Sequence, residues 1–146
     1  MNYGRLAAAA VAATLVDSIY GYLVYGVLLA NGFAVYPGVY RTAEAGAAYL
    51  PAMFACIFVG LLAASYIYAK GYEGGSGVAE GARFGLLLGV FVAAVFAGVN
   101  YATLNIGLRL SLQLAVAALV EWTLIGAVVG AVYRPSSAPA RRAAGV

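Results

Sequence analysis

The chain has 146 residues, of which 65% are hydrophobic and only 9% are charged, whereas an average soluble domain is about half apolar and about a quarter charged. Eight basic and five acidic side chains are too few to cover the surface of a globule of this size, but they are enough for the ends and loops of a membrane bundle. The composition therefore excludes a soluble domain and indicates an integral membrane protein.

Four apolar stretches are each long enough to cross roughly 30 Å of hydrocarbon as a helix. The first contains Asp17 and is too long for a cleavable signal peptide, so we expect it to be retained as a helix. The stretches cover about residues 5–30, 46–69, 79–103 and 108–133.

The pattern predicts an all-α fold, a four-helix transmembrane bundle with antiparallel up-down topology. A link of only four residues, Leu104–Gly107, forces the last two helices into a hairpin. We expect a single domain over residues 1–134, followed by a disordered cytoplasmic tail at residues 135–146, where proline, small residues and two arginines gather.

The two longer connections carry turn and capping signals. Asn31–Ala45 contains Asn-Gly and Tyr-Pro-Gly, which predict a loop, with a short interfacial helix near Thr42–Ala48. Gly71–Gly77 is a glycine-rich link. Ser76 is placed to cap the third helix, and Glu80 falls in its first turn, on the favourable side of the helix dipole.

Basic residues predict the orientation, because cytoplasmic loops carry an excess of lysine and arginine. With the N-terminus inside, six basic residues lie on the cytoplasmic side and two lie outside. We therefore expect both termini to be cytoplasmic. The inner set is Arg5, Lys70, Arg83, Arg134, Arg141 and Arg142, and the outer set is Arg41 and Arg109.

Small residues recur at four-residue spacing along every stretch. Helices in lipid have no hydrophobic drive to associate, so they depend on close backbone approach along such faces. We expect these stripes to pack within the chain, with a dedicated homodimer surface as the alternative, and we expect Cys56 to be a packing residue. The stripes contain Ala9 and Ala13; Ala52, Cys56, Gly60 and Ala64; Gly81, Gly85 and Gly89; and Gly126 and Gly130.

Two acids occur at bilayer depth, where placing an ionisable side chain costs at least about 2.5 kcal/mol of free energy. Such a residue therefore usually has a polar partner or a functional role. Asp17 lies twelve residues after Arg5, and Glu121 lies thirteen residues before Arg134. The helical rise therefore places both acids about 18–20 Å from the inner helix ends, close to the midplane. If both point inward, we expect the two carboxyl groups to meet.

Two carboxyl groups in one apolar site cannot easily both ionise. One hypothesis is therefore that at least one of them is protonated, with the proton shared through a hydrogen bond between Asp17 and Glu121. The interpretation we favour is that each acid bonds separately to a tyrosine, threonine or tryptophan and serves only to join helices. The groups available for this are Tyr20, Thr14 and Trp122.

A second polar line follows the fourth stretch, where Arg109, Gln113 and Glu121 share one face. We expect a cavity along this face, with Asn100 at the height of Gln113 and able to bond to it. Arg109 either extends to the headgroups, which we favour, or pairs inside the bundle. The predicted intramembrane polar site consists of Asp17, Glu121, Gln113, Asn100 and Tyr20.

Absent residue types limit the chemistry. A chain without histidine has no His-ligated haem, His-bound zinc or Ser-His catalysis, and a single cysteine forms no intrachain disulfide. The net charge of +3 is not arranged as a basic stripe with exposed aromatic residues, so no nucleic acid is expected as a partner. We expect no cofactor and no metal site.

Three short segments carry a family resemblance. Tyr36-Pro37 precedes Tyr40-Arg41 in the first loop, Glu80-Gly81-Ala82-Arg83-Phe84-Gly85 opens the third stretch, and Tyr133-Arg134-Pro135 ends the fourth. In these motifs and in the spacing of its spans, the chain resembles an uncharacterised family of small bacterial four-span integral membrane proteins. The resemblance implies a four-helix fold and a location in the inner (plasma) membrane, and no activity.

Three functions remain open. The first is a multi-pass membrane protein that acts through helix association, as a small subunit or modulator, with a homo-oligomer or another membrane protein as its partner. The second is a small proton-coupled or small-molecule transporter that uses Asp17 and Glu121. The third, an intramembrane enzyme, is the weakest, because two acids alone specify no reaction.

Overall fold

The structure is a computed structural model, and it describes residues 1–133, so the expected tail at residues 135–146 lies outside the described part. Its four longest helical segments are long and apolar enough to cross a membrane. These segments are Tyr3–Leu28, Leu50–Gly71, Gly77–Thr103 and Leu108–Val132. They lie within a few residues of the predicted stretches and suggest a multi-pass membrane protein. The side of the membrane that holds the termini stays a prediction.

Two of the four spans are interrupted by a wider turn. The first and third spans each change from α-helix to π-helix toward the end of the bundle at which the loop between the first two spans lies. The second and fourth spans are α-helical throughout. The elements are α1 (Tyr3–Gly21), the π-helix η1 (Tyr22–Leu28), α2 (Ala30–Ala34), α3 (Ala43–Ala47), α4 (Leu50–Gly71), α5 (Gly77–Val92), the π-helix η2 (Ala93–Gly98), α6 (Val99–Thr103) and α7 (Leu108–Val132).

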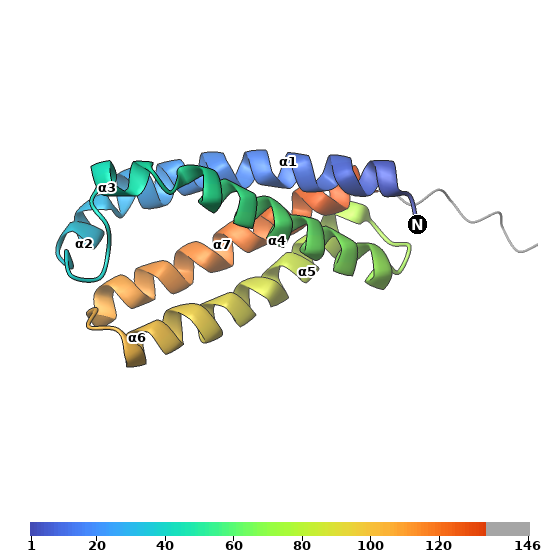
Figure 1. Cartoon of the computed structure of the whole chain (residues 1–146). Coiled ribbons are helices and arrows are strands. Elements are labelled where there is room, and N and C mark those ends of the chain that lie inside the picture. The colour runs from blue at the N-terminus through green and yellow to red at the C-terminus, as the bar shows by residue number, and fades with distance from the viewer. Residues whose placement is uncertain (134–146) are drawn as a thin grey trace, which may run out of the picture.

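The four long helices form an all-α bundle in which neighbours in sequence run in opposite directions (Figure 1). α7 lies at the centre, packed against α5 along much of its length and against α1 on another side. α4 packs mainly against α1 and has few contacts with α7. The bundle is therefore a close α5–α7 hairpin with an α1–α4 pair laid against it.

The α5–α7 contact is made by backbone against backbone. A Cβ atom added to Gly81 would lie 2.9 Å from Cα of Gly130, and one added to Gly85 would lie 2.9 Å from Cα of Gly126. Both added atoms would also collide with backbone carbonyl oxygens of α7. Gly89 faces Leu119, with its added Cβ 3.0 Å from Cα of that residue. These glycines thus serve packing within the chain.

The side chains that pack best gather at one end of the bundle, which we call the core end. It contains the N-terminus, the α4–α5 link and the last turns of α7 (Figure 1). Ring contacts join Tyr68 to Tyr133 and to Phe84. The core cluster consists of Leu6, Ala9, Ala13, Leu61, Tyr68, Ile125, Val129 and Tyr133. The opposite end, which we call the loop end, has no comparable cluster within the described residues.

The first connection differs in part from the prediction. The expected short helix is present as α3, and the side chain of Thr42 caps it by accepting a hydrogen bond from the Ala45 N–H. Asn31-Gly32 does not form a turn, because the chain continues through both residues as α2. Gly32 allows α2 to lie against α7, since a Cβ there would be 3.2 Å from Cδ1 of Leu110.

The small-residue stripe of α4 also departs from the expectation of packing within the chain. Ala64 is buried, but Ala52, Cys56 and Gly60 are exposed. No other atom lies within 4 Å of a Cβ built on Gly60. The reason is the path of α4, which packs on α1 at the core end and leaves α7 toward the loop end (Figure 1).

The glycine contact predicts a position-specific response to one added methyl group. In Gly126→Ala the new Cβ would lie 2.6 Å from Cα of Gly85. Overpacking of this kind should lower the free energy of unfolding by about 1–3 kcal/mol or more. Thermal unfolding in detergent, followed by circular dichroism, measures the effect. Gly60→Ala is the matched control and should be neutral or slightly stabilising; equal losses for both variants would contradict the contact.

Candidate functional site

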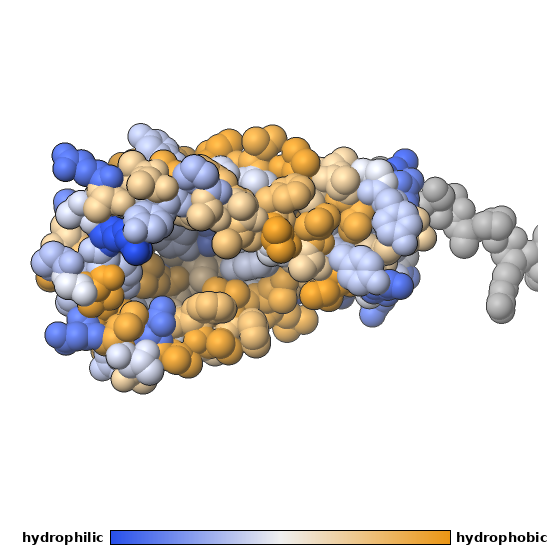
Figure 2. Space-filling model, in the orientation of Figure 1, coloured by the Kyte–Doolittle hydropathy of each residue, from blue (hydrophilic) through white to orange (hydrophobic). Residues whose placement is uncertain are grey.

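A cavity of about 700 Å³ lies between α1, α4 and α7, on the loop-end side of the core cluster. Figure 2, in the same orientation as Figure 1, shows a hollow between the segment that leads into α4 and the α6–α7 end of the hairpin. The lining combines aromatic and aliphatic side chains with two carboxyl groups. It consists of Asp17, Ser18, Gly21, Tyr22, Tyr25, Gly26, Leu50, Met53, Phe54, Ile57, Glu121 and Trp122.

Both acids singled out in the sequence line this cavity. Glu121, on α7, is buried, and Asp17, on α1, is half-buried. The two carboxyl groups are close enough to interact electrostatically. No hydrogen bond joins them in the described structure, however, so the geometry does not support the hypothesis of a shared proton. Glu121 is bonded to a tyrosine instead.

That tyrosine is Tyr25, whose hydroxyl donates to Oε2 of Glu121 over 2.7 Å. The sequence pointed to Tyr20, but the Tyr20 hydroxyl donates to the backbone oxygen of Ala117 over 2.9 Å. The two rings meet edge to face at 6.2 Å between centroids. Tyr20 thus joins α1 to α7 beside the cavity, and Tyr25 is the residue that contacts the carboxylate.

The π-helix η1 explains why Tyr25 was missed. In a regular α-helix, a residue eight positions after Asp17 is rotated by about 80° from it. A π-helix takes more residues per turn, so η1 brings Tyr25 back toward the face of Asp17. Such π-helical turns are frequent at functional sites. The sequence shows a tyrosine in the same span, but regular α-helical spacing does not place it on the face of Asp17.

The other predicted members of the polar site lie elsewhere. Gln113 faces α2, where its Oε1 would be 4.0 Å from a Cβ built on Gly32. Asn100 is in α6, beyond η2, whose wider turn also shifts the register of the third span. Within residues 1–133 no hydrogen bond joins Asn100 to Gln113. Arg109 is exposed at the loop end and makes no ion pair with any described acid.

Glu121 thus bonds separately to a tyrosine, as the favoured interpretation expected, but the partner is Tyr25 and not one of the residues named for this role. Thr14 donates to the backbone oxygen of Ala10 over 2.8 Å, within its own helix. Trp122 lines the cavity and makes no hydrogen bond to a described residue. Asp17 therefore faces the cavity without a hydrogen-bond donor in the part of the chain that the structure describes.

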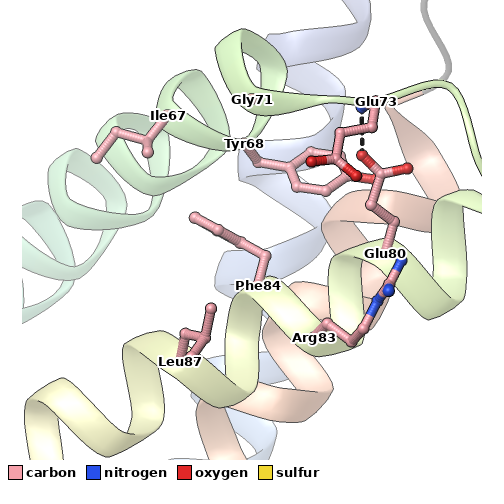
Figure 3. Close-up of a pocket in the computed structure, with 8 residues that line it drawn as sticks. All are labelled: Ile67, Tyr68, Gly71, Glu73, Glu80, Arg83, Phe84 and Leu87. Carbon is pink, nitrogen blue, oxygen red and sulfur yellow. Dashed lines mark hydrogen bonds between the residues drawn. The ribbon is translucent and has the colours of Figure 1, made fainter.

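A second pocket, of about 360 Å³, lies at the core end beside the α4–α5 link (Figure 3). Glu80 is buried there and accepts hydrogen bonds from the backbone N–H groups of Glu73, at 2.5 Å, and Gly75, at 3.1 Å. Ser76 holds the N-cap position of α5 but makes no capping bond with its side chain. Glu80 therefore fixes the link, which gives this pocket a structural explanation.

Arg83 lines the same pocket, but no ion pair joins it to Glu73 or Glu80 within residues 1–133. The described residues also contain no group of three or more side chains of the types that hold a metal ion. Of these two pockets, the cavity with Asp17 and Glu121 is the one that holds a half-buried acid without a hydrogen-bond donor among the described residues, because the Glu73 carboxylate of the other pocket is exposed.

Comparisons with protein-family models, curated proteins and solved structures find no match to this chain. The family resemblance seen in the sequence is therefore not supported by a match, and no family is identified. The four long apolar helices and the geometry of the cavity carry the functional argument.

The Tyr25–Glu121 bond predicts a selective loss of stability. Tyr25→Phe removes the donor and keeps the ring, so the free energy of unfolding should fall by about 0.5–2 kcal/mol, the range for polar contacts between membrane helices. Unfolding in mixed micelles, followed by circular dichroism, measures this change. Tyr22→Phe is the control, because the Tyr22 hydroxyl makes no hydrogen bond to a described residue; an equal effect there would contradict the prediction.

The Glu80 contacts predict a second loss, at the core end. Glu80→Ala leaves the N–H groups of Glu73 and Gly75 without their acceptor, which should lower the free energy of unfolding by about 1–3 kcal/mol. The Glu73→Ala variant should change it little, because the Glu73 carboxylate is exposed and accepts no hydrogen bond from a described residue. Chemical unfolding of both variants tests the difference.

Proposed function

We propose that the protein is a small-molecule transporter that binds an organic cation with an apolar body between α1, α4 and α7 and exchanges it for a proton of the Asp17 and Glu121 pair. The observation that carries the proposal is the meeting of both acids on one cavity that no lysine or arginine lines. Acids inside a membrane protein are expensive and usually mark a pathway for ions, protons or substrate.

The size and lining of the cavity favour a small organic ligand. A volume of about 700 Å³ is within the usual range of ligand sites, roughly 300–1,000 Å³. Trp122, Tyr22 and Phe54 offer aromatic surface, which binds organic cations through the negative faces of the rings. A cation with an apolar body therefore suits both the rings and the carboxylates.

The two acids are held differently, which suits exchange. Glu121 is fixed by Tyr25, whereas Asp17 has no hydrogen-bond donor among the described residues. A protonated carboxyl group and a carboxylate paired with a cation carry the same net charge. Replacing one proton by one monovalent cation therefore leaves no uncompensated charge in the apolar interior, where such a charge is costly.

The rim of the cavity favours access from the bilayer. Leu50, Met53 and Phe54, at the start of α4, are each more than 40% exposed, and Tyr22 lies opposite them on the first span. In a membrane, such side chains contact lipid. An organic cation with an apolar body, dissolved near the headgroups, could thus enter between α1 and α4 without crossing a layer of polar side chains.

Binding should depend on both acids and on charge. N-methyl-4-phenylpyridinium is a suitable probe, with 4-methylbiphenyl as a neutral compound of the same shape. Calorimetry on the full chain should show that Asp17→Asn and Glu121→Gln each weaken binding of the cation about tenfold or more. Trp122 is the only tryptophan of the chain, so quenching of its fluorescence places the ligand in the cavity.

The same titration should depend on pH. Lower pH adds protons to the carboxylates and removes the charge that attracts the cation, so the affinity should fall as pH falls. A variant that combines Asp17→Asn with Glu121→Gln should show no such dependence. Glu73→Gln, a change of equal charge outside the cavity, should bind like the unchanged protein. Equal affinity for the neutral compound, or full affinity in the double variant, would refute the proposal.

Transport is tested in proteoliposomes. A vesicle interior more acidic than the medium should drive accumulation of the cation, and Asp17→Asn should abolish this accumulation. Binding without accumulation would restrict the function to that of a binding protein.

A second function, helix association as a small membrane subunit or modulator, is favoured by the exposed stripe of Ala52, Cys56 and Gly60. Small residues on a lipid-facing helix allow another helix to approach closely. Cys56 is the only cysteine of the chain, so mild oxidation in bilayers should produce a disulfide-linked dimer if two copies meet there. Gly60→Leu should then prevent the crosslink, and its absence in the unchanged protein would exclude this homodimer.

A further inference from the structure

We propose that the groove between the first span and α7 at the loop end binds one anionic phospholipid, with its phosphate at Arg109 and an acyl chain along α7. The site shares no lining residue with the cavity of Asp17 and Glu121. The proposal is thus independent of the transport function and can fail or succeed separately.

The headgroup end is a polar cavity of about 490 Å³ at the start of α7. Its lining brings together the side chains of Arg109, Asn31, Gln113 and Tyr36. All four carry hydrogen-bond donors, and no acid lines the cavity. Arg109 makes no ion pair within residues 1–133, so its guanidinium group is available to an anion.

Tyr36 adds a donor with a fixed position. Its hydroxyl oxygen accepts a hydrogen bond from the Gly107 N–H over 2.9 Å, and no described group accepts the hydroxyl proton. Gly107 permits this close approach, because a Cβ there would lie 2.6 Å from the Tyr36 oxygen. The contact holds the loop against the start of α7 and leaves the hydroxyl proton available for donation to a ligand.

The polar cavity continues into an apolar one. A neighbouring groove of about 440 Å³ shares Leu28, Leu29 and Gln113 with it. The groove runs along α7 to Val120 and is lined almost wholly by apolar side chains. From Arg109 to Val120 the helical rise is about 17 Å, close to the depth of one leaflet, which is half of the roughly 30 Å hydrocarbon core.

This combination identifies the occupant by its chemistry. A free phosphate would use the donors and leave the groove empty, and a diacylglycerol would fill the groove and leave Arg109 without an anion. A zwitterionic phospholipid would bring a second cation to the same donors together with its phosphate. A phospholipid with net negative charge satisfies both parts, because arginine binds phosphate through strong charge-assisted hydrogen bonds. The lipid comes from the leaflet at the loop end.

Native mass spectrometry of the purified full chain in a non-ionic detergent tests the site. Dioleoylphosphatidylglycerol should bind at one saturable site. Dioleoylphosphatidylcholine and dioleoylglycerol should bind at least threefold more weakly, and inorganic phosphate alone should not compete. Equal binding of either other lipid, or competition by phosphate at the same affinity, would overturn the assignment.

Two variants locate the lipid. Arg109→Gln removes the cation, and Val116→Trp fills the groove; each should weaken phosphatidylglycerol binding about tenfold, whereas Arg109→Lys should stay within about threefold of the unchanged protein. Arg41→Gln, at the same end, and Val90→Trp, on the lipid face of α5, are the controls and should bind normally. Equal binding by Arg109→Gln and Arg41→Gln would refute the site even if Val116→Trp failed to fold.

Discussion

The close approach of the α5 and α7 backbones determines the rest of the arrangement. Because glycines meet at this contact, α7 lies deep against α5 and presents its remaining faces to α1 and, at the core end, to α4. The α1–α4 pair then closes over α7 only where Leu61, Tyr68 and Ile125 can pack. Toward the loop end, α4 has no comparable surface to meet, and the space between the helices remains as the cavity.

The two π-helices adapt the spans to this arrangement. Each inserts a wider turn toward the loop end, where the helices are less tightly held. In the first span this turn brings Tyr25 to Glu121, so an acid that would be costly in lipid gains a donor from another helix. Asp17 lies on the regular part of the same span and keeps its carboxyl group facing the cavity.

The sequence predicted the parts of the structure that depend on length, apolar content and local spacing. These were the four spans, the last hairpin and the helix α3. The sequence placed a cavity on the face of Arg109, Gln113 and Glu121, but of these only Glu121 lines the cavity that holds Asp17. It could not predict Tyr25 or the position of Asn100, because a π-helix changes which residues share a face and leaves no mark in a periodic pattern. The exposed part of the α4 stripe was also missed, since its burial depends on the path of a neighbouring helix.

The uneven distribution of packed side chains has a mechanical consequence. The aromatic and aliphatic cluster that joins the helices lies at one end of the bundle. The Tyr68–Tyr133 contact belongs to this end, whereas Leu50 begins α4 at the other end and is exposed. Any rotation of α4 about the packed end would therefore displace Leu50 further than Tyr68.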